Sequence, residues 1–173
     1  LLTAVQHDGP SAIRYPRGSC PAPWQKRAPE ALPIGRGETL RAGEDIAIVA
    51  VGPQVQVASE AAARLEADGV SAEVINARFV KPLDEQRICE AAERCGRMIV
   101  LEENALIGGF GSAVLEVLSE KAPECRVARI GVPDRFVEHN KPAVQLAGCG
   151  LTAEDVAARA REMCADKAPA AAK

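Results

Sequence analysis

The chain has 173 residues, enough for one compact domain with a short additional segment but too few for two full domains. Hydrophobic residues make up 47% and charged residues 26%, a globular mixture that excludes a disordered, collagen-like or coiled-coil chain. The net charge of −3 and an aromatic content of 3% argue against a nucleic-acid-binding protein, which needs a basic surface and stacking side chains.

Compartment and metal content follow from the apolar runs and the cysteines. The longest apolar run, within residues 46–51, is too short to cross a bilayer, and no signal peptide opens the chain. The six cysteines are widely spaced without a Cys-x-x-Cys pair, which favours reduced thiols in a cytoplasmic protein. Neither His7 nor His139 stands at ligand spacing from a cysteine, so we predict no metal site. Because no apolar run is long enough to cross a bilayer, we also predict no membrane partner.

The first part of the chain does not have the pattern of a complete domain. Residues 1–5 resemble the end of a helix, and residues 11–15 form a short extended run. Prolines 21, 23, 29 and 33 then interrupt any regular structure, which predicts a linker over residues 19–36. Residues 1–18 are therefore expected to be the tail end of a preceding domain. Because the chain also lacks an initiator methionine, we expect a piece of a longer protein.

A regular α/β pattern begins after the linker and defines a domain over residues 37–166. Residues 37–40 are a candidate antiparallel edge strand, and residues 45–51 form an apolar strand typical of a buried sheet. A helix is predicted over residues 54–68, where apolar residues recur at helical spacing and Gly69 supplies a left-handed stop.

The next elements have their own start and stop signals. A strand is predicted over residues 70–75, and Asp84 is placed to cap a helix that Gly96 ends. A third strand follows over residues 98–101. Residues 70–75 and 98–101 are mainly apolar, as expected for strands covered on both faces.

The last elements continue the same alternation. A glycine-led helix is predicted over residues 108–120, a strand over residues 126–130 and a final helix over residues 152–164. Thr152 and Asp155 have capping-box spacing at the start of that helix. Alternation of strands and helices predicts a mainly parallel, twisted α/β sheet of about five strands with helices on both faces. The alanine-rich residues 167–173 are expected to be a frayed tail.

Three motifs could carry function. The glycine-rich run 108–112 lacks the Gly-x-Gly-x-x-Gly spacing of dinucleotide-binding loops, so tight helix packing or close contact between subunits is the favoured interpretation. Glu102 and Glu103 follow a strand, but adjacent residues there point to opposite faces, which favours a structural role over a paired acid–base site. Arg14 and Arg17 bracket Tyr-Pro and could form an anion pocket, although solvated or ion-paired arginines are the simpler interpretation.

No Ser-His-Asp set, phosphate-binding loop or metal cluster occurs in the sequence. From the residues alone, a binding or assembly module is as good an interpretation as an enzyme.

The motifs together resemble one family. Six segments, in order along nearly the whole chain, are similar to 1-deoxy-D-xylulose-5-phosphate synthases: residues 9–18 (GPSAIRYPRG), 32–37 (LPIGRG), 77–84 (ARFVKPLD), 102–104 (EEN), 108–112 (GGFGS) and 131–136 (GVPDRF). The resemblance implies a transketolase C-terminal-like domain preceded by the last strand of a pyrimidine-binding domain.

The resemblance also implies a function for the longer protein. The family condenses pyruvate with glyceraldehyde 3-phosphate, with loss of carbon dioxide, and its product serves isoprenoid, thiamine and pyridoxal synthesis. It uses thiamine diphosphate and magnesium and works as a homodimer. By resemblance Arg17, and more weakly Arg14, contact the phosphate of glyceraldehyde 3-phosphate. The cofactor-binding domain is absent from this sequence, so we expect no cofactor, metal or catalytic residue in the chain itself. The alternative is a free-standing transketolase-like module that binds a partner without catalysis.

Overall fold

The structure, a computed structural model, describes residues 1–13 and 28–165. The chain divides into two compact units, residues 1–34 and 35–173, and each is described by itself. In the first unit, α1 (Leu2–Gln6) is a short helix that buries no residue. The Leu32 N–H donates to Thr3 Oγ1 at 2.7 Å and ties the two ends of this unit together. The predicted linker (19–36) and tail (167–173) lie partly or wholly outside the described residues, so these boundaries stay predictions.

The second unit contains a five-stranded sheet in the order β1-β3-β2-β4-β5. Its strands are β1 (Glu38–Arg41), β2 (Ile46–Ala50), β3 (Ala72–Asn76), β4 (Arg97–Ala105) and β5 (Arg126–Val132). β3, β2, β4 and β5 are parallel, and β1 pairs antiparallel with β3 at the edge. The predicted architecture, including the antiparallel edge strand, is confirmed.

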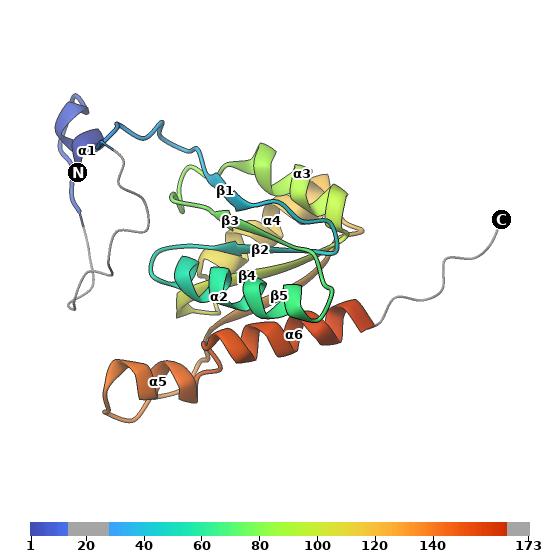
Figure 1. Ribbon diagram of the computed structural model, residues 1–173. Helices are drawn as coiled ribbons and strands as arrows, with labels where there is room; N and C mark the ends of the chain where they lie inside the picture. The colour runs from blue at the N-terminus through green and yellow to red at the C-terminus, as the bar shows by residue number, and fades with distance from the viewer. Residues whose placement is uncertain (14–27, 166–173) are drawn as a thin grey trace. The chain divides into compact units, whose positions relative to one another are not determined.

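Helices cover both faces of this sheet, as Figure 1 shows for α3 on one side and for α2 and α6 on the other. Between residues 35 and 165 the structure has five helices: α2 (Gln54–Ala67), α3 (Glu85–Cys95), α4 (Phe110–Lys121), α5 (Pro142–Gly148) and α6 (Ala153–Ala165). Strand β2 alternates between two apolar clusters. Ile46, Ile48 and Ala50 join the α2–α6 side, whereas Ala47 and Val49 join the α3–α4 side. All five residues of β2 are buried, as its continuous apolar run predicted.

The predicted helix ends agree with the structure at three places. Asp84 caps α3 by accepting the Arg87 N–H, and Gly96 ends the same helix in the left-handed conformation with φ of 64°. At α6 the Thr152 N–H donates to Asp155 Oδ2 while the Asp155 N–H donates to Thr152 Oγ1, both at 3.2 Å. This reciprocal pair is the predicted capping box.

The structure corrects several boundaries. β3 spans Ala72–Asn76 instead of residues 70–75, and β4 continues to Ala105 instead of ending at residue 101. α4 begins at Phe110, two residues after the predicted start, and the seven-residue α5 was not predicted. Glu73, in the middle of β3, is a charged residue that is only 2% exposed, because this strand is covered on both faces. No helix in the described part of the chain is long and apolar enough to span a membrane.

Candidate functional site

The carboxyl ends of the four parallel strands meet at one edge of the sheet, where open α/β sheets usually bind ligands. Four segments of the chain leave the sheet there. Gly52 and Pro53 follow β2, Arg78 follows β3, the end of β4 leads into the glycine-rich turn before α4, and Pro133 follows β5. We call this region the carboxyl edge.

Glu102 is the central side chain of the carboxyl edge. It is 1% exposed, and its Oε2 and Oε1 atoms accept the N–H groups of Phe110 at 2.7 Å and Gly111 at 2.8 Å. These N–H groups belong to the first turn of α4. N–H groups in that turn have no acceptor within their own helix, and they form the positive end of the helix dipole. The chain's own carboxylate therefore occupies the position where the glycine-rich turn could have held a phosphate.

The glycines of the turn allow this close packing. A Cβ atom at Gly109 would lie 2.2 Å from the Ala105 carbonyl oxygen and 2.4 Å from Glu102 Oε2. A Cβ atom at Gly111 would lie 2.9 Å from Arg129 Cδ. Any larger residue at Gly109 would displace the backbone of β4 or the capping carboxylate. The structure thus supports the helix-packing interpretation of this motif and the structural role predicted for Glu102, while Glu103 is exposed.

Arg129 and Ser112 hold the loop in front of α4. Arg129 Nη1 donates to the Leu106 carbonyl oxygen at 2.7 Å and to Ser112 Oγ at 3.0 Å. Ser112 Oγ in turn accepts the Gly108 N–H at 3.1 Å. The loop between β4 and α4 is consequently fixed at both ends by hydrogen bonds from β5 and from the helix.

Arg78 is the position at the carboxyl edge that sequence reasoning did not single out. Among the described residues it is the one non-glycine with positive φ, at 58°, a conformation that costs about 1–3 kcal/mol and often marks a functional position. Its N–H donates to Asn76 Oδ1 at 3.1 Å, and its guanidinium pairs with Glu38. A short polar side chain two residues before an arginine was the only sequence signal, and such Asn-x-x turns are too common to identify a site.

Asp84 anchors the point at which the chain enters the sheet. It is 6% exposed and accepts the Gly37 N–H at 2.9 Å, just before β1 begins. Arg36 and Arg87 form ion pairs with the same carboxylate at 3.5 and 3.4 Å. Burial would raise the pKa of Asp84, but the two N–H groups and the two guanidinium groups outweigh burial and hold the pKa below its ordinary value.

The predicted site residues Arg17 and Arg14 lie outside the residues that the structure describes, so their roles stay predictions. Within the described ranges, no group of three or more His, Cys, Asp or Glu side chains could hold a metal ion. Large apolar side chains are exposed on the segments that follow β4 and β5. Ile107 is 71% exposed, Val144 is 52% exposed, and Phe136 is fully exposed. Exposed apolar side chains on neighbouring segments are typical of a surface that another polypeptide covers.

Comparison with known proteins places this geometry in a family. The family model described as "Transketolase, C-terminal domain" matches residues 35–156, which include the whole sheet. The chain belongs to this family. The fold is also that of a solved structure titled "Split gene transketolase, inactive beta4 tetramer", at a TM-score of 0.75 and 40% identity over 80% of this chain and 45% of that one. A transketolase from Pichia stipitis matches at a TM-score of 0.51 and 24% identity over 75% of this chain and 18% of that one, which supports the fold alone.

The curated relatives are synthases. The chain is 49% identical to 1-deoxy-D-xylulose-5-phosphate synthase of Heliobacterium modesticaldum, over 94% of this chain and 25% of the relative. It is 51% identical to 1-deoxy-D-xylulose-5-phosphate synthase 1 of Geobacter sulfurreducens, over 99% of this chain and 27% of the relative. The family resemblance seen in the sequence motifs is confirmed, and the chain spans about a quarter of the length of these relatives.

Proposed function

We propose that this chain is the carboxy-terminal part of a thiamine-diphosphate-dependent synthase that condenses pyruvate with glyceraldehyde 3-phosphate to 1-deoxy-D-xylulose 5-phosphate. The observation that carries the proposal is identity of about one half to such synthases over nearly the whole chain. The product would supply isoprenoid, thiamine and pyridoxal synthesis, and we expect the parent enzyme to work in the cytoplasm.

The described residues do not fit the diphosphate of the cofactor. The turn most suited to a phosphate is occupied by Glu102, whose two oxygens already accept the Phe110 and Gly111 N–H groups. A diphosphate there would face a buried carboxylate, which repels it. Thiamine diphosphate and magnesium would therefore be held by the remaining domains of the parent. Calorimetric titration of the isolated chain with both tests this point, and micromolar binding would contradict it.

In the proposed enzyme this part of the chain has two tasks. The first is contact with the phosphate of glyceraldehyde 3-phosphate through Arg17, with Arg14 as the weaker candidate, because a guanidinium donates paired hydrogen bonds to phosphate. The second is assembly of a homodimer. The exposed side chains of Ile107 and Phe136 support an assembly role for the segments after β4 and β5.

A chimeric enzyme tests the proposed function. The corresponding quarter of the Geobacter sulfurreducens synthase, which is 51% identical to this chain, would be replaced by this chain. The expected result is formation of 1-deoxy-D-xylulose 5-phosphate by the chimera, measured beside the intact synthase and a truncated synthase without the replaced part. A chimera that folds and binds thiamine diphosphate but forms no more product than the truncated enzyme would refute the proposal.

A second candidate is a separately encoded module that joins its catalytic partner without a peptide bond. It is favoured by the solved relative whose title describes a split-gene transketolase. In that case the chain would restore product formation when it is added to the truncated synthase as a separate polypeptide. Restoration only by the covalent chimera would favour the first candidate.

A further inference from the structure

The predicted linker joins the sheet at the carboxyl edge. β1 begins at Glu38, which pairs with Asn76, the last residue of β3. Just before β1, the chain changes from exposed at residues 31–34 to half-buried at Gly35 and buried at Gly37. The chain is therefore held against the second unit at the edge where open α/β sheets usually bind ligands.

Two glycines allow this entry to pack closely. Gly35 has a positive φ of 76°, and a Cβ atom there would lie 2.9 Å from Pro82 Cγ. A Cβ atom at Gly37 would lie 3.0 Å from the Asn76 carbonyl oxygen. A larger residue at Gly35 would displace the chain from Pro82, so the path of the chain here depends on the missing side chain.

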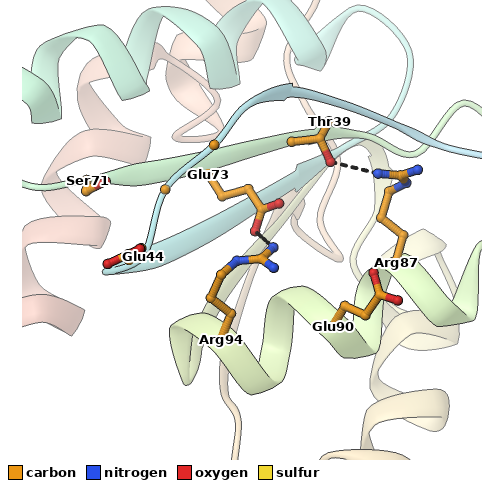
Figure 2. Close-up of a pocket in the computed structure, with 9 residues that line it drawn as sticks. Thr39, Glu44, Ser71, Glu73, Arg87, Glu90 and Arg94 are labelled. Atoms are coloured by element: carbon orange, nitrogen blue, oxygen red, sulfur yellow. Dashed lines mark hydrogen bonds and ion pairs between the residues drawn. The ribbon is translucent and has the colours of Figure 1, made fainter.

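Asp84 holds the same entry by polar contacts. Its Oδ2 accepts the Gly37 N–H at 2.9 Å, and its Oδ1 lies 3.5 Å from Arg36 Nη1. Arg87 of α3 connects this carboxylate to β1, because its Nε lies 3.4 Å from Asp84 Oδ2 and its Nη1 donates to Thr39 Oγ1 at 2.8 Å (Figure 2). Packing and hydrogen bonds thus fix three consecutive residues of the entering chain.

These contacts are additional to those that the sheet itself needs. Pairing of β1 with β3 starts at Glu38, after the three residues that are held. The Arg87 N–H alone would satisfy Asp84 as the cap of α3, yet the carboxylate also binds Arg36 and Gly37 on the linker side. The contacts therefore act on the entering chain.

We call residues 35–37 with Pro82 and Asp84 the linker anchor. We propose that the linker anchor positions the phosphate-contact segment of the parent enzyme, by fixing the direction in which the linker leaves this domain. The inference rests on the proposed function, because Arg17 is the proposed contact to the phosphate of glyceraldehyde 3-phosphate. Arg17 and Arg36 are 19 positions apart in the sequence, and fixing one end of so short a segment restricts where its other end can lie. The anchor residues act through Arg17 and are positioning residues.

Gly35→Ala disturbs the anchor, and Gly69→Ala is its matched control. Gly69 has nearly the same positive φ, 77°, but a Cβ atom there would meet nothing within 4 Å. Both substitutions carry the same backbone strain, and only Gly35→Ala displaces a neighbour. In the whole chain studied by NMR, the Gly37 amide hydrogen should exchange about tenfold faster in Gly35→Ala and at the original rate in Gly69→Ala.

Steady-state kinetics of the chimeric synthase measure the functional effect. Gly35→Ala should raise the KM for glyceraldehyde 3-phosphate about tenfold, within the loss of up to about 100-fold that a misplacement of about 1 Å causes. Arg36→Gln removes only the ion pair of a 58% exposed side chain with Asp84 and should raise this KM by up to about fivefold. Arg41→Gln removes a partly exposed ion pair with Glu66 at the other end of β1 and should leave it unchanged. The KM for pyruvate, which has no phosphate, should change little in all of these variants.

Three results would overturn the proposal. The first is an equal effect of Gly35→Ala and Gly69→Ala on the KM for glyceraldehyde 3-phosphate. The second is an equal rise of the KM for both substrates with a lower Tm, which is the pattern of a purely structural role. The third is an unchanged KM in both the Gly35→Ala and the Arg36→Gln chimeras. If the unmodified chimera forms no product, the proposed function is refuted and the inference fails with it, whereas an active chimera with any of the three results refutes the anchor alone.

Discussion

Replacement of Glu102 tests how the carboxyl edge is held together. The Glu102 carboxylate is buried and accepts two N–H groups, from Phe110 at 2.7 Å and from Gly111 at 2.8 Å. Glu102→Gln preserves the shape of the side chain but turns one acceptor oxygen into an amide NH₂, which faces an N–H group. One hydrogen bond to a charged group is lost, and the amide NH₂ and the backbone N–H that it faces are both left without an acceptor, which together cost about 1.5–3 kcal/mol.

Two further variants calibrate this effect. Glu102→Ala removes both hydrogen bonds and should cost about 3–6 kcal/mol, which is comparable to the whole stability of a small domain. Glu103→Gln changes the neighbouring exposed glutamate and should alter stability by less than about 0.5 kcal/mol. Urea unfolding at pH 7, followed by circular dichroism, measures the free energy of unfolding for each variant. A Glu102→Gln protein as stable as the Glu103→Gln protein would refute the capping role of Glu102.

The remaining predictions concern packing, pH dependence and assembly. Gly109→Ala should lower the free energy of unfolding by about 1–3 kcal/mol, because its Cβ would lie 2.2 Å from the Ala105 oxygen. Gly148→Ala should leave the free energy of unfolding unchanged, because its Cβ meets nothing within 4 Å. Equal effects of the two variants in urea unfolding would count against the packing argument. Asp84→Asn should cost about 1–3 kcal/mol at pH 7. The pKa of Asp84 is lowered in the folded state, so the stability difference between the two proteins should persist above the unfolded pKa of about 3.9 and disappear as the pH falls through the folded pKa. If the free energies of unfolding of the two proteins fall in parallel from about pH 7 to about pH 3, this prediction is contradicted. Phe136→Asp should weaken self-association in a sedimentation concentration series, and an unchanged association constant would exclude this side chain from the interface.

Local signals in the sequence were sufficient for most elements of the fold. Asp84 and Gly96 mark the two ends of α3, and Thr152 with Asp155 marks the start of α6, because capping depends only on residues within one turn. The end of β4 was missed because residues 102–104 are polar, and a strand there is recognised only through pairing with β5. α5 was missed because it buries no residue and so has no apolar stripe.

The sites were less predictable because their contacts join distant residues. Strand alternation predicted that Glu102 and Glu103 face opposite sides, and burial confirms this difference. The partners of Glu102, eight and nine residues later, could not be identified before the turn was seen in three dimensions. Glu73 and Arg94 are 21 residues apart, and neither position suggested that the buried Glu73 carboxylate pairs with a partly exposed arginine. The strained backbone of Arg78 had no specific sequence signal, because an asparagine two residues earlier is too common a turn signal and residues other than glycine rarely adopt positive φ.

The proposed function assigns the phosphate contact of the synthase to Arg17, and steady-state kinetics of the chimeric synthase with Arg17→Ala test this claim. Loss of one charge-assisted contact of about 1.5–3 kcal/mol predicts a kcat/KM for glyceraldehyde 3-phosphate that is lower by about 10- to 150-fold. The KM for pyruvate, which has no phosphate, should change little, and Arg17→Lys should recover only part of the loss because an ammonium group lacks the paired donors. An equal loss for both substrates, together with a lower Tm, would contradict the claim and leave Arg17 a structural role.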